Sequence, residues 1–199
     1  MGYYKDDRSF TNYVHNNLAI PKIYETLGWN ILEIDKDRLE YIDINLGIDY
    51  VLKNQNGTIK NIQERFRDSF YQKYNDATLR YRRDKNSDPS RMKSEFFKIK
   101  ADYLVYGITN GKKFIDKRHT LTDFIKWVIL DLNYLKEKYE NKELEIVTTK
   151  KITCEIFNQK LICPENFNPD GSSSFIPFDI LMLNKLWGDK VIIAQNRYF

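Results

Sequence analysis

Two apolar runs joined by a short polar turn constrain the fold of this chain more than any other feature. Residues 46–53 read LGIDYVLK, residues 58–67 read TIKNIQERFR, and NQNG lies between them at 54–57. An Asn-Gly pair between apolar runs is a strong signal for a β-hairpin, because both residues tolerate the positive φ of a tight turn. The segment therefore predicts two antiparallel strands, the first of which contains an acid, Asp49.

A carboxylate inside a strand is costly to bury unless a partner compensates its charge. The second strand offers partners, since Gln63, Glu64 and Arg65 follow one another fourteen residues after Asp49. Alternate residues of a strand share a face, so Gln63 and Arg65 point to the same side. We expect that side to be the one to which Asp49 can point across the hairpin.

An acid on one strand, with an oxygen ligand and a cation two residues apart on the next, suits metal-dependent phosphodiester hydrolysis. Oxygen ligands on adjacent strands can hold Mg²⁺ beside a phosphate. A nearby Lys or Arg then neutralises the charge that develops in the transition state. The hairpin contains this arrangement in variant form, because Gln63 and Arg65 occupy the ligand and cation positions.

The run Gly47-Ile48-Asp49, followed by the turn and by Gln63-Glu64-Arg65, resembles the PD-(D/E)XK nuclease superfamily. Its signature is an Asp in a Gly-hydrophobic-Asp context, a hairpin turn, and then Glu or Asp, any residue, and Lys. The resemblance covers roughly residues 9–108. It implies an α/β, restriction-endonuclease-like mixed sheet flanked by helices.

The resemblance also implies roles for individual residues. Asp49 would bind Mg²⁺, or Mn²⁺ in its place. Gln63 would stand in for the second acid, Arg65 for the Lys, and the carbonyl of Glu64 would complete the metal shell. Glu25, on the first helix, would join the site.

The departures from the signature leave alternatives open. Gln is a neutral ligand, and Arg holds its proton too firmly to act as a base, although it can steady a phosphate. Glu64 is therefore an alternative second carboxylate and metal ligand, if the strand is twisted or bulged to present it. In plainer interpretations Asp49 pairs with a structural Arg, Gln63 and Arg65 form an exposed polar face, and Glu25 is solvated.

Positive charge is concentrated directly after the QER run. Residues 60–100 contain 12 Lys and Arg against 6 acids, whereas the rest of the chain has 20 against 22. Such clustering, interleaved with aromatic residues, is the footprint of a polyanion partner. The expected nucleic-acid contacts are Arg67, Lys73, Arg80, Tyr81, Arg82, Arg83 and Lys98. The alternative is a solvated surface with Tyr rings in the core.

The rest of the chain supplies further elements by pattern and turn signals. Pro21 is expected to break or restart the first helix, and Gly47 to mark a bend or bulge. The expected elements are a helix over 9–29, strands over 30–35, 39–54, 58–67 and 96–109, a long loop with some helix over 68–95, a helix over 121–139, a two-stranded hairpin over 144–164, a helix over 178–187 and a strand over 190–199.

The chain has 199 residues and 42% hydrophobic residues, which suits one soluble domain. We expect a nuclease-like core over 1–111 that 112–199 complete or extend as a dimer face. No apolar run is long enough to span a membrane, and a charged N-terminus argues against a signal peptide. Cys154 and Cys163 suggest free thiols in a reducing cytoplasm, with a hairpin disulfide as the alternative.

The functional expectation is a Mg²⁺-dependent endonuclease that cleaves double-stranded DNA, most closely like a type II restriction endonuclease. Such an enzyme would act as a homodimer on a two-fold symmetric target. Phe175, Ile176, Phe178 and Trp187 could supply an apolar dimer contact, or pack in the core. The alternatives are a structure-selective repair nuclease, a non-catalytic DNA-binding module, and a protein that binds an acidic partner.

Overall fold

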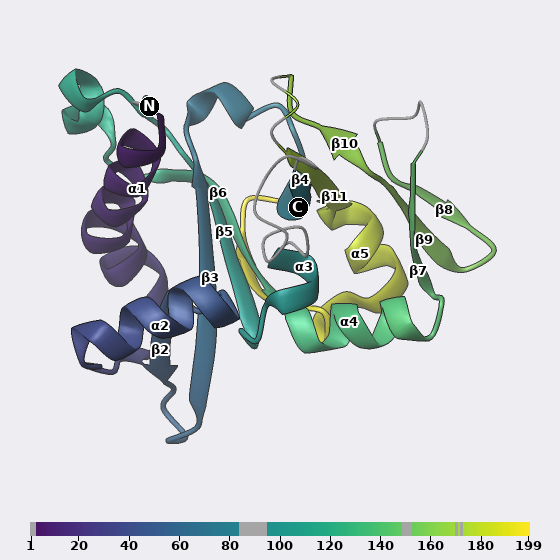
Figure 1. Cartoon of the computed structure of the whole chain (residues 1–199), viewed down its shortest axis with the longest axis horizontal. Helices are drawn as coiled ribbons and strands as arrows, with labels where there is room; N and C mark the ends of the chain where they lie inside the picture. The colour runs from purple at the N-terminus through teal and green to yellow at the C-terminus, as the bar shows by residue number, and fades with distance from the viewer. Residues whose placement is uncertain (1–2, 84–94, 149–152, 170, 172) are drawn as a thin grey trace.

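A computed structural model of the chain describes residues 3–83, 95–148, 153–169, 171 and 173–199. Its centre is a six-stranded mixed sheet, with a three-stranded sheet and helices packed on one side and the N-terminal helices on the other (Figure 1). The expected α/β class is confirmed. In spatial order the large sheet consists of β1 (Asn30–Ile31), β2 (Tyr50–Lys53), β3 (Ile59–Arg67), β5 (Tyr103–Thr109), β6 (Phe124–Asp131) and β12 (Ile192–Asn196).

The hairpin expected around Asn56-Gly57 is confirmed. Strands β2 and β3 pair antiparallel, with Tyr50 opposite Ile62 and Lys53 opposite Ile59. The turn closes through a hydrogen bond of 3.0 Å from the amide of Asn54 to the carbonyl of Thr58. Gly57 has a φ of 80°, a conformation that glycine adopts without strain.

The N-terminal helix is confirmed, but it begins and ends a few residues earlier than expected. Helix α1 (Tyr3–Val14) continues without a break into a π-helix, η1 (His15–Tyr24). Pro21 lies inside η1, so it does not break the helix. The apolar face, including Val14, Leu18 and Ile23, packs against Ile62 of β3 on one face of the large sheet.

Residues expected as strand just before the hairpin form a helix instead, α2 (Lys36–Leu46). The side chain of Asp35 caps it by accepting hydrogen bonds from the amides of Asp37 and Arg38. Gly47 ends it with a φ of 60°. The β-branched and aromatic residues of the segment suggested a strand, but the strong caps at both ends favour the helix.

The crossover from β3 to β5 contains a strand, β4, that was not predicted from the sequence. The crossover consists of η2 (Ser69–Tyr71), β4 (Asp76–Arg83) and α3 (Glu95–Lys98). Strand β4 leaves the large sheet and pairs with β11 (Ser173–Asp179), which also pairs with β10 (Asn166–Phe167). Strand β5 then returns parallel to β3, and it begins seven residues later than the predicted strand.

The helix expected over 121–139 is wrong in its first half. Residues Phe124–Asp131 form β6, and the helix α4 covers only Leu132–Glu140. The apolar stripe of helical spacing coincides with a run rich in β-branched and aromatic residues, which the sheet buries on both faces. Asp131 caps α4 by accepting a hydrogen bond from the amide of Tyr134.

In the C-terminal segment, the last helix and strand agree with prediction, whereas residues 144–164 differ from it. The helix α5 (Ile180–Trp187) and the strand β12 are confirmed. The predicted two-stranded hairpin contains three strands, because β7 is added parallel to the hairpin of β8 and β9. The remaining elements are β7 (Leu144–Val147), β8 (Glu155–Phe157), β9 (Lys160–Pro164), and the 3₁₀ turns η4 (Ile115–Thr120) and η5 (Gly188–Lys190).

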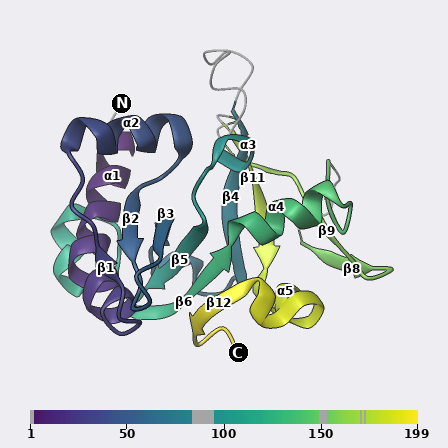
Figure 2. The ribbon, with the colours of Figure 1, turned by 90° about the horizontal axis from the view of Figure 1, so that it is seen from below.

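Two apolar cores lie on the two faces of the large sheet (Figure 2). One lies under α1 and η1, and the other lies between the large sheet, the β4–β11 sheet and the helices α4 and α5. Ile176 and Phe178 are fully buried in the second core, so they are not available as a dimer contact. Cys154 and Cys163 are buried free thiols with their sulfur atoms 3.6 Å apart. None of the described helices has the length and apolar character needed to cross a membrane.

Candidate functional site

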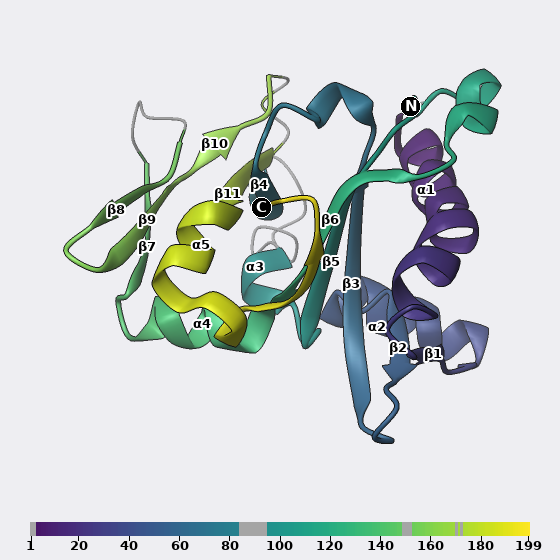
Figure 3. The ribbon, with the colours of Figure 1, turned by 180° about the vertical axis from the view of Figure 1, so that it is seen from behind.

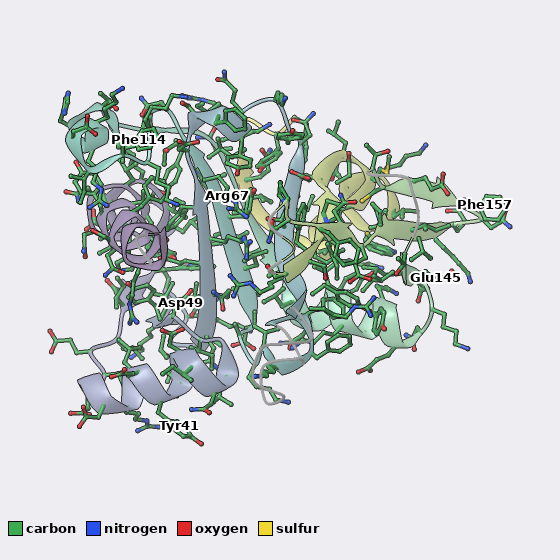
Figure 4. All side chains as sticks on the ribbon, turned by 45° about the horizontal axis from the view of Figure 1, so that its top comes forward. Tyr41, Asp49, Arg67, Phe114, Glu145 and Phe157 are labelled. Carbon is green, nitrogen blue, oxygen red and sulfur yellow. The ribbon has the colours of Figure 1, made fainter. Side chains whose placement is uncertain are left out.

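Asp49 lies where the chain leaves α2 and enters β2. Gly47 turns the chain, and the amide of Asp49 donates a hydrogen bond of 2.8 Å to the carbonyl of Ile62. Asp49 is therefore fixed beside β3 before the β2 ladder begins. Figure 4 shows it close to α2, at some distance along β3 from Arg67.

The carboxylate of Asp49 contacts β3 as the hairpin pattern predicted. Its Oδ2 accepts a hydrogen bond of 2.7 Å from Nε2 of Gln63 and one of 2.6 Å from the amide of Glu64. The Gln63 side chain lies near Gly47, where an added Cβ would be 3.3 Å from Gln63 Oε1. A side chain at position 47 would thus crowd the site and strain the helix end.

Arg65 and Arg67 follow Gln63 on the same face of β3. The pairing with β5 is regular, with Gln63 opposite Leu104, Arg65 opposite Tyr106, and no shift from Ile62 to Arg67. The two guanidinium groups lie close enough to Tyr106 to oppose a rise in its pKa, which burial nevertheless raises. One face of β3 therefore carries, in order, an amide bonded to a carboxylate and two cations.

Glu64 points to the opposite face, towards η1. Its side chain is buried, and Oε1 lies 2.8 Å from Nδ1 of His15 and accepts a hydrogen bond from the hydroxyl of Tyr24. The His15 ring stacks on Tyr50, with ring centroids 3.6 Å apart and planes 3° from parallel. The regular register of β3 contains no bulge that would present this carboxylate beside that of Asp49, so the expected twist is not found.

The two tyrosines near Glu64 stay protonated. Burial first, and then the charges of Glu64 and Asp49, raise the pKa of Tyr24 and of Tyr50 well above the ordinary tyrosine value. Tyr24 is thereby kept as a hydrogen-bond donor to Glu64. The network fixes the Glu64 side chain on the η1 side while its amide remains directed at Asp49.

Sequence reasoning missed His15, Tyr24 and Tyr50 as neighbours of the site. His15 and Tyr24 lie 49 and 40 residues before Glu64, and no local pattern connects such positions. Glu25, the expected acid of the first helix, is exposed at the end of η1. The buried residue beside it, Tyr24, is the one that contacts β3.

The donor atoms around Asp49 are compatible with a hard cation. The Asp49 carboxylate, the Gln63 side-chain oxygen and the Glu64 carbonyl oxygen are all ligands of the type that Mg²⁺ accepts. Gln63 Nε2 donates to Asp49 and, at 3.3 Å, to the Glu64 carbonyl, so these groups already converge. Rotating the amide of Gln63 by half a turn presents its oxygen in place of its nitrogen. Among the described residues no three His, Cys, Asp or Glu side chains group as a metal site. This set contains the single carboxylate of Asp49, because the Glu64 side chain points to His15 and Tyr24.

Two of the expected nucleic-acid contacts are engaged in the structure. Arg82 forms a two-pronged ion pair with Glu165, whose side chain is almost fully buried. Burial acts to raise the pKa of Glu165, but hydrogen bonds from Arg82, Ser174 and Thr148 outweigh it and lower that pKa. Tyr81 packs against Phe96 and Phe97, with ring centroids 6.0 and 5.2 Å away. Both residues therefore stabilise the second sheet.

The other expected contacts differ in their surroundings. Arg67 lies over the ring of Tyr71 at 5.1 Å, and one guanidinium nitrogen is 3.4 Å from Thr78 Oγ1. Lys73 is exposed and lies 5.1 Å from the centre of the Tyr74 ring. Arg80 and Lys98 are half-buried. The backbone of Arg83 pairs with Ser173, and its side chain lies outside the described part of the structure.

A further titratable group, Lys126, was not predicted. It lies on the same face of the large sheet as Arg67, since both are paired with Ile108 of β5. It is buried on β6 and donates a hydrogen bond of 2.7 Å from Nζ to the side chain of Asn75. Burial lowers the pKa of Lys126, and the neighbouring Asp76 partly opposes this. Burial raises the pKa of Asp76 itself. The hydrogen bond to Asn75 and the charge of Asp76 thus link Lys126 of β6 to the start of β4.

Fold and site together define an α/β protein in which an Asp just before β2 is hydrogen-bonded to a Gln of β3, with cations on the same face of β3. No protein-family model matches the chain, and neither a curated protein sequence nor a solved structure matches it. The residues of this site and the resemblance of its hairpin motif are therefore the basis for inferring a function.

Proposed function

We propose that this protein is a Mg²⁺-dependent endonuclease acting on double-stranded DNA. The observation that carries the proposal is the bond of 2.7 Å between Gln63 and Asp49, on the strand face that Arg65 shares. Around it, a helix is followed by the antiparallel strands β1, β2 and β3, with α2 between the first two, and then by a crossover to the parallel strand β5. This order supports the restriction-endonuclease-like sheet that the resemblance implies. Cleavage in the manner of a type II restriction endonuclease, and a homodimer, belong to this proposal.

The residues of the site divide the chemistry between them. Asp49, the Gln63 side-chain oxygen and the Glu64 carbonyl would hold the cation, with Mn²⁺ as a possible replacement for Mg²⁺. When bound, such a cation polarises a phosphate and lowers the pKa of a water. Arg65 donates charge-assisted hydrogen bonds to a phosphate and holds it in place. It keeps its own proton, so the base must come from elsewhere.

The cations beyond the site supply affinity for the phosphate backbone. Arg67 and Lys73 continue from the end of β3, and Arg80, Arg83 and Lys98 come from the crossover that follows. Contacts of this type are independent of base sequence and weaken steeply with salt. Arg82 forms an ion pair with Glu165, so among the predicted contacts we expect it to contribute least to DNA affinity.

The decisive experiment is cleavage of long plasmid and phage DNA with Mg²⁺ or Mn²⁺ against chelator. It compares the wild type with Asp49→Ala and with Asp37→Ala, an exposed acid on α2 that serves as the matched control. We expect cleavage that requires both the metal and Asp49, and that Asp37→Ala retains. Discrete fragments would indicate a restriction endonuclease. Cleavage only at branched or damaged positions would indicate a structure-selective nuclease.

A non-catalytic DNA-binding module is the second candidate. The observation that favours it is that the site contains one carboxylate, and that this carboxylate is hydrogen-bonded to Gln63 and to the Glu64 amide. In that case wild type and Asp49→Ala would both retain DNA in a salt-dependent manner, and neither would cut it with any metal. That result would contradict the catalytic proposal.

A further inference from the structure

Two loops lie together at the end of the large sheet where the parallel strands β3 and β5 finish. They comprise residues 68–75 and 110–120 and are called here the loop surface. The amide of Ser69 donates to the carbonyl of Gly111 at 3.0 Å, and the amide of Lys113 donates to the Asp68 side chain at 3.2 Å. Figures 1 and 3 show η2 and the segment leading to η4 at this same end.

Large apolar side chains of the loop surface are directed at solvent. Phe70 is 64% exposed, Phe114 is 65% exposed and Ile115 is 68% exposed. Tyr71 and Tyr74 are also exposed, and the rings touch in sequence, Phe70 to Tyr71 at 5.4 Å and Tyr71 to Tyr74 at 6.3 Å between centroids. Exposed rings gathered in this way mark an interaction site more often than an ordinary surface.

Positive charge accompanies these rings. Arg67 and Lys73 each lie 5.1 Å from the centre of a tyrosine ring. Arg67 and the loop surface together contain six Lys and Arg against two Asp. In the second loop Lys112 and Lys117 are exposed, whereas Arg118 is half-buried and donates a hydrogen bond of 2.7 Å to Ser9 Oγ. The sequence patterns did not single out this loop.

The combination points to a nucleic acid and not to an apolar protein surface. A groove of cations follows the phosphate backbone, and aromatic rings stack on bases whose faces are open. Bases of an intact duplex are already stacked on each other, so rings at the protein surface gain most where the bases are unpaired or the duplex is kinked.

We propose that the loop surface binds nucleic acid at unpaired bases, which stack on Phe70, Tyr71, Tyr74 and Phe114 while the cations hold the backbone. This inference rests on the proposed function in taking nucleic acid as the ligand, and it adds a preferred form of substrate. Gln63 and Arg67 are four positions apart on β3, or about 13 Å at strand spacing. Because the rings lie beyond Arg67, the stacked bases would lie at least roughly four base steps from the Asp49 site.

The test measures binding with chelator present, so that cleavage cannot interfere. Fluorescence anisotropy follows three labelled DNAs: a single strand, a duplex with a central unpaired loop, and the fully paired duplex. The double variant Phe70→Ala/Phe114→Ala is compared with wild type and with Tyr41→Ala, which removes a ring that is 63% exposed on α2. Figure 4 shows Tyr41 and Phe114 far apart, with Asp49 between them.

We expect wild type to prefer the two DNAs with unpaired bases, and the double variant to bind them at least about tenfold more weakly. Tyr41→Ala should bind as wild type does. Because the removed rings are exposed, thermal unfolding should be unchanged, which separates lost binding from lost folding. Lys73→Gln/Lys112→Gln should reduce the dependence of binding on salt for all three DNAs.

Two outcomes would overturn the inference. One is equal affinity of wild type and the double variant for the unpaired DNAs. The other is binding of phosphatidylserine vesicles through these rings with no DNA bound, which would assign the surface to a membrane. The proposed enzyme activity is judged separately: metal-dependent cleavage without ring dependence removes only this inference, and ring-dependent binding without cleavage removes only the catalytic proposal.

Discussion

The two faces of strand β3 place neighbouring residues in opposite environments. Gln63 lies on the half-buried face, bonded to Asp49 and followed by Arg65 and Arg67. Glu64 lies on the other face, buried beneath η1 with His15 and Tyr24. The alternation of a strand, and not the identity of the residue, decides which side chain can reach a substrate. Of Gln63 and Glu64, the carboxylate of Glu64 is the stronger metal ligand, and its side chain is the one buried in the interior.

This comparison also separates stability from function. A buried carboxylate depends on its donors, because loss of one leaves charge without compensation in a medium of low polarity. The Gln63 amide and the Arg65 guanidinium are only half-buried, so their truncation should cost less, since water can replace part of their contacts. Substitutions on the η1 face should therefore affect unfolding, and those on the Asp49 face should affect cleavage.

The largest effect is expected from Arg65→Ala. Loss of a charge-assisted donor to the transition state should slow cleavage by roughly 10²–10³-fold, or about 3–4 kcal/mol of barrier. The free energy of unfolding should change by less than about 1 kcal/mol. Single-turnover cleavage rates and urea unfolding measure the two quantities. Arg67→Ala is the control, and it should weaken DNA binding more than it slows cleavage; equal rates for wild type and Arg65→Ala would remove Arg65 from the site.

On the opposite face, His15→Leu should act chiefly on stability. Of the two described donors to the buried Glu64 carboxylate it leaves the Tyr24 hydroxyl, and it removes the stack on Tyr50. The free energy of unfolding should therefore fall by about 3 kcal/mol. Urea denaturation measures this loss. His119→Leu, at an exposed position, should change it by no more than about 0.5 kcal/mol. A loss equally small for His15→Leu would mean that the network contributes nothing to folding.

Gln63→Glu tests the Asp49 face through the metal. It replaces a hydrogen bond to Asp49 by two carboxylates in contact, which repel one another unless a cation lies between them. With chelator the variant should be less stable than wild type by about 1–2 kcal/mol, and Mg²⁺ should raise its Tm more than that of wild type. Thermal unfolding with and without Mg²⁺ measures both effects. Gln72→Glu, at an exposed position, should respond to Mg²⁺ as wild type does, and the same response from Gln63→Glu would argue against a cation site here.

The smallest effect concerns Arg82, a predicted DNA contact that the structure commits to Glu165. The lowered pKa of Glu165 stabilises the fold fully above the usual glutamate value of 4.5, and this contribution is lost as the pH falls through the lowered value. Arg82→Gln should thus cost less than about 1 kcal/mol at neutral pH, because the Arg82 side chain is 54% exposed and Thr148 and Ser174 still donate to Glu165. The cost should be less still at pH about 3. Urea unfolding across this pH range measures the difference. A difference that grows on acidification would contradict the assignment.

Local patterns predicted the parts of the fold that short-range chemistry determines. The Asn-Gly turn determined the hairpin, its register placed Gln63 against Asp49, and α5 and β12 were recognisable from their own residues. Strand β4 was not predicted, since it is polar and basic and depends on pairing with β11, nearly a hundred residues later. In β6, burial on both faces outweighed a stripe of helical spacing.

The candidate site divides in the same way. Asp49, Gln63 and Arg65 lie within one hairpin, so turn geometry and alternation were enough to bring them together. The partners of Glu64 come from η1, across a packing contact that no spacing rule describes. Because the sequence does not reveal the contact with η1, it leaves Glu64 as an alternative metal ligand. In the structure, the regular register of β3 places the Glu64 side chain on the face opposite Gln63.

The most direct test of this account compares cleavage by Gln63→Ala and Glu64→Gln, two substitutions of consecutive residues. Initial rates on the same DNA with Mg²⁺ are measured for both variants and for wild type. We expect Gln63→Ala to lose at least about a hundredfold in rate, whereas Glu64→Gln, whose backbone atoms are retained, should lose less than about tenfold. The reverse order would show that Glu64 supplies the second carboxylate, and would contradict the assignment of the two faces.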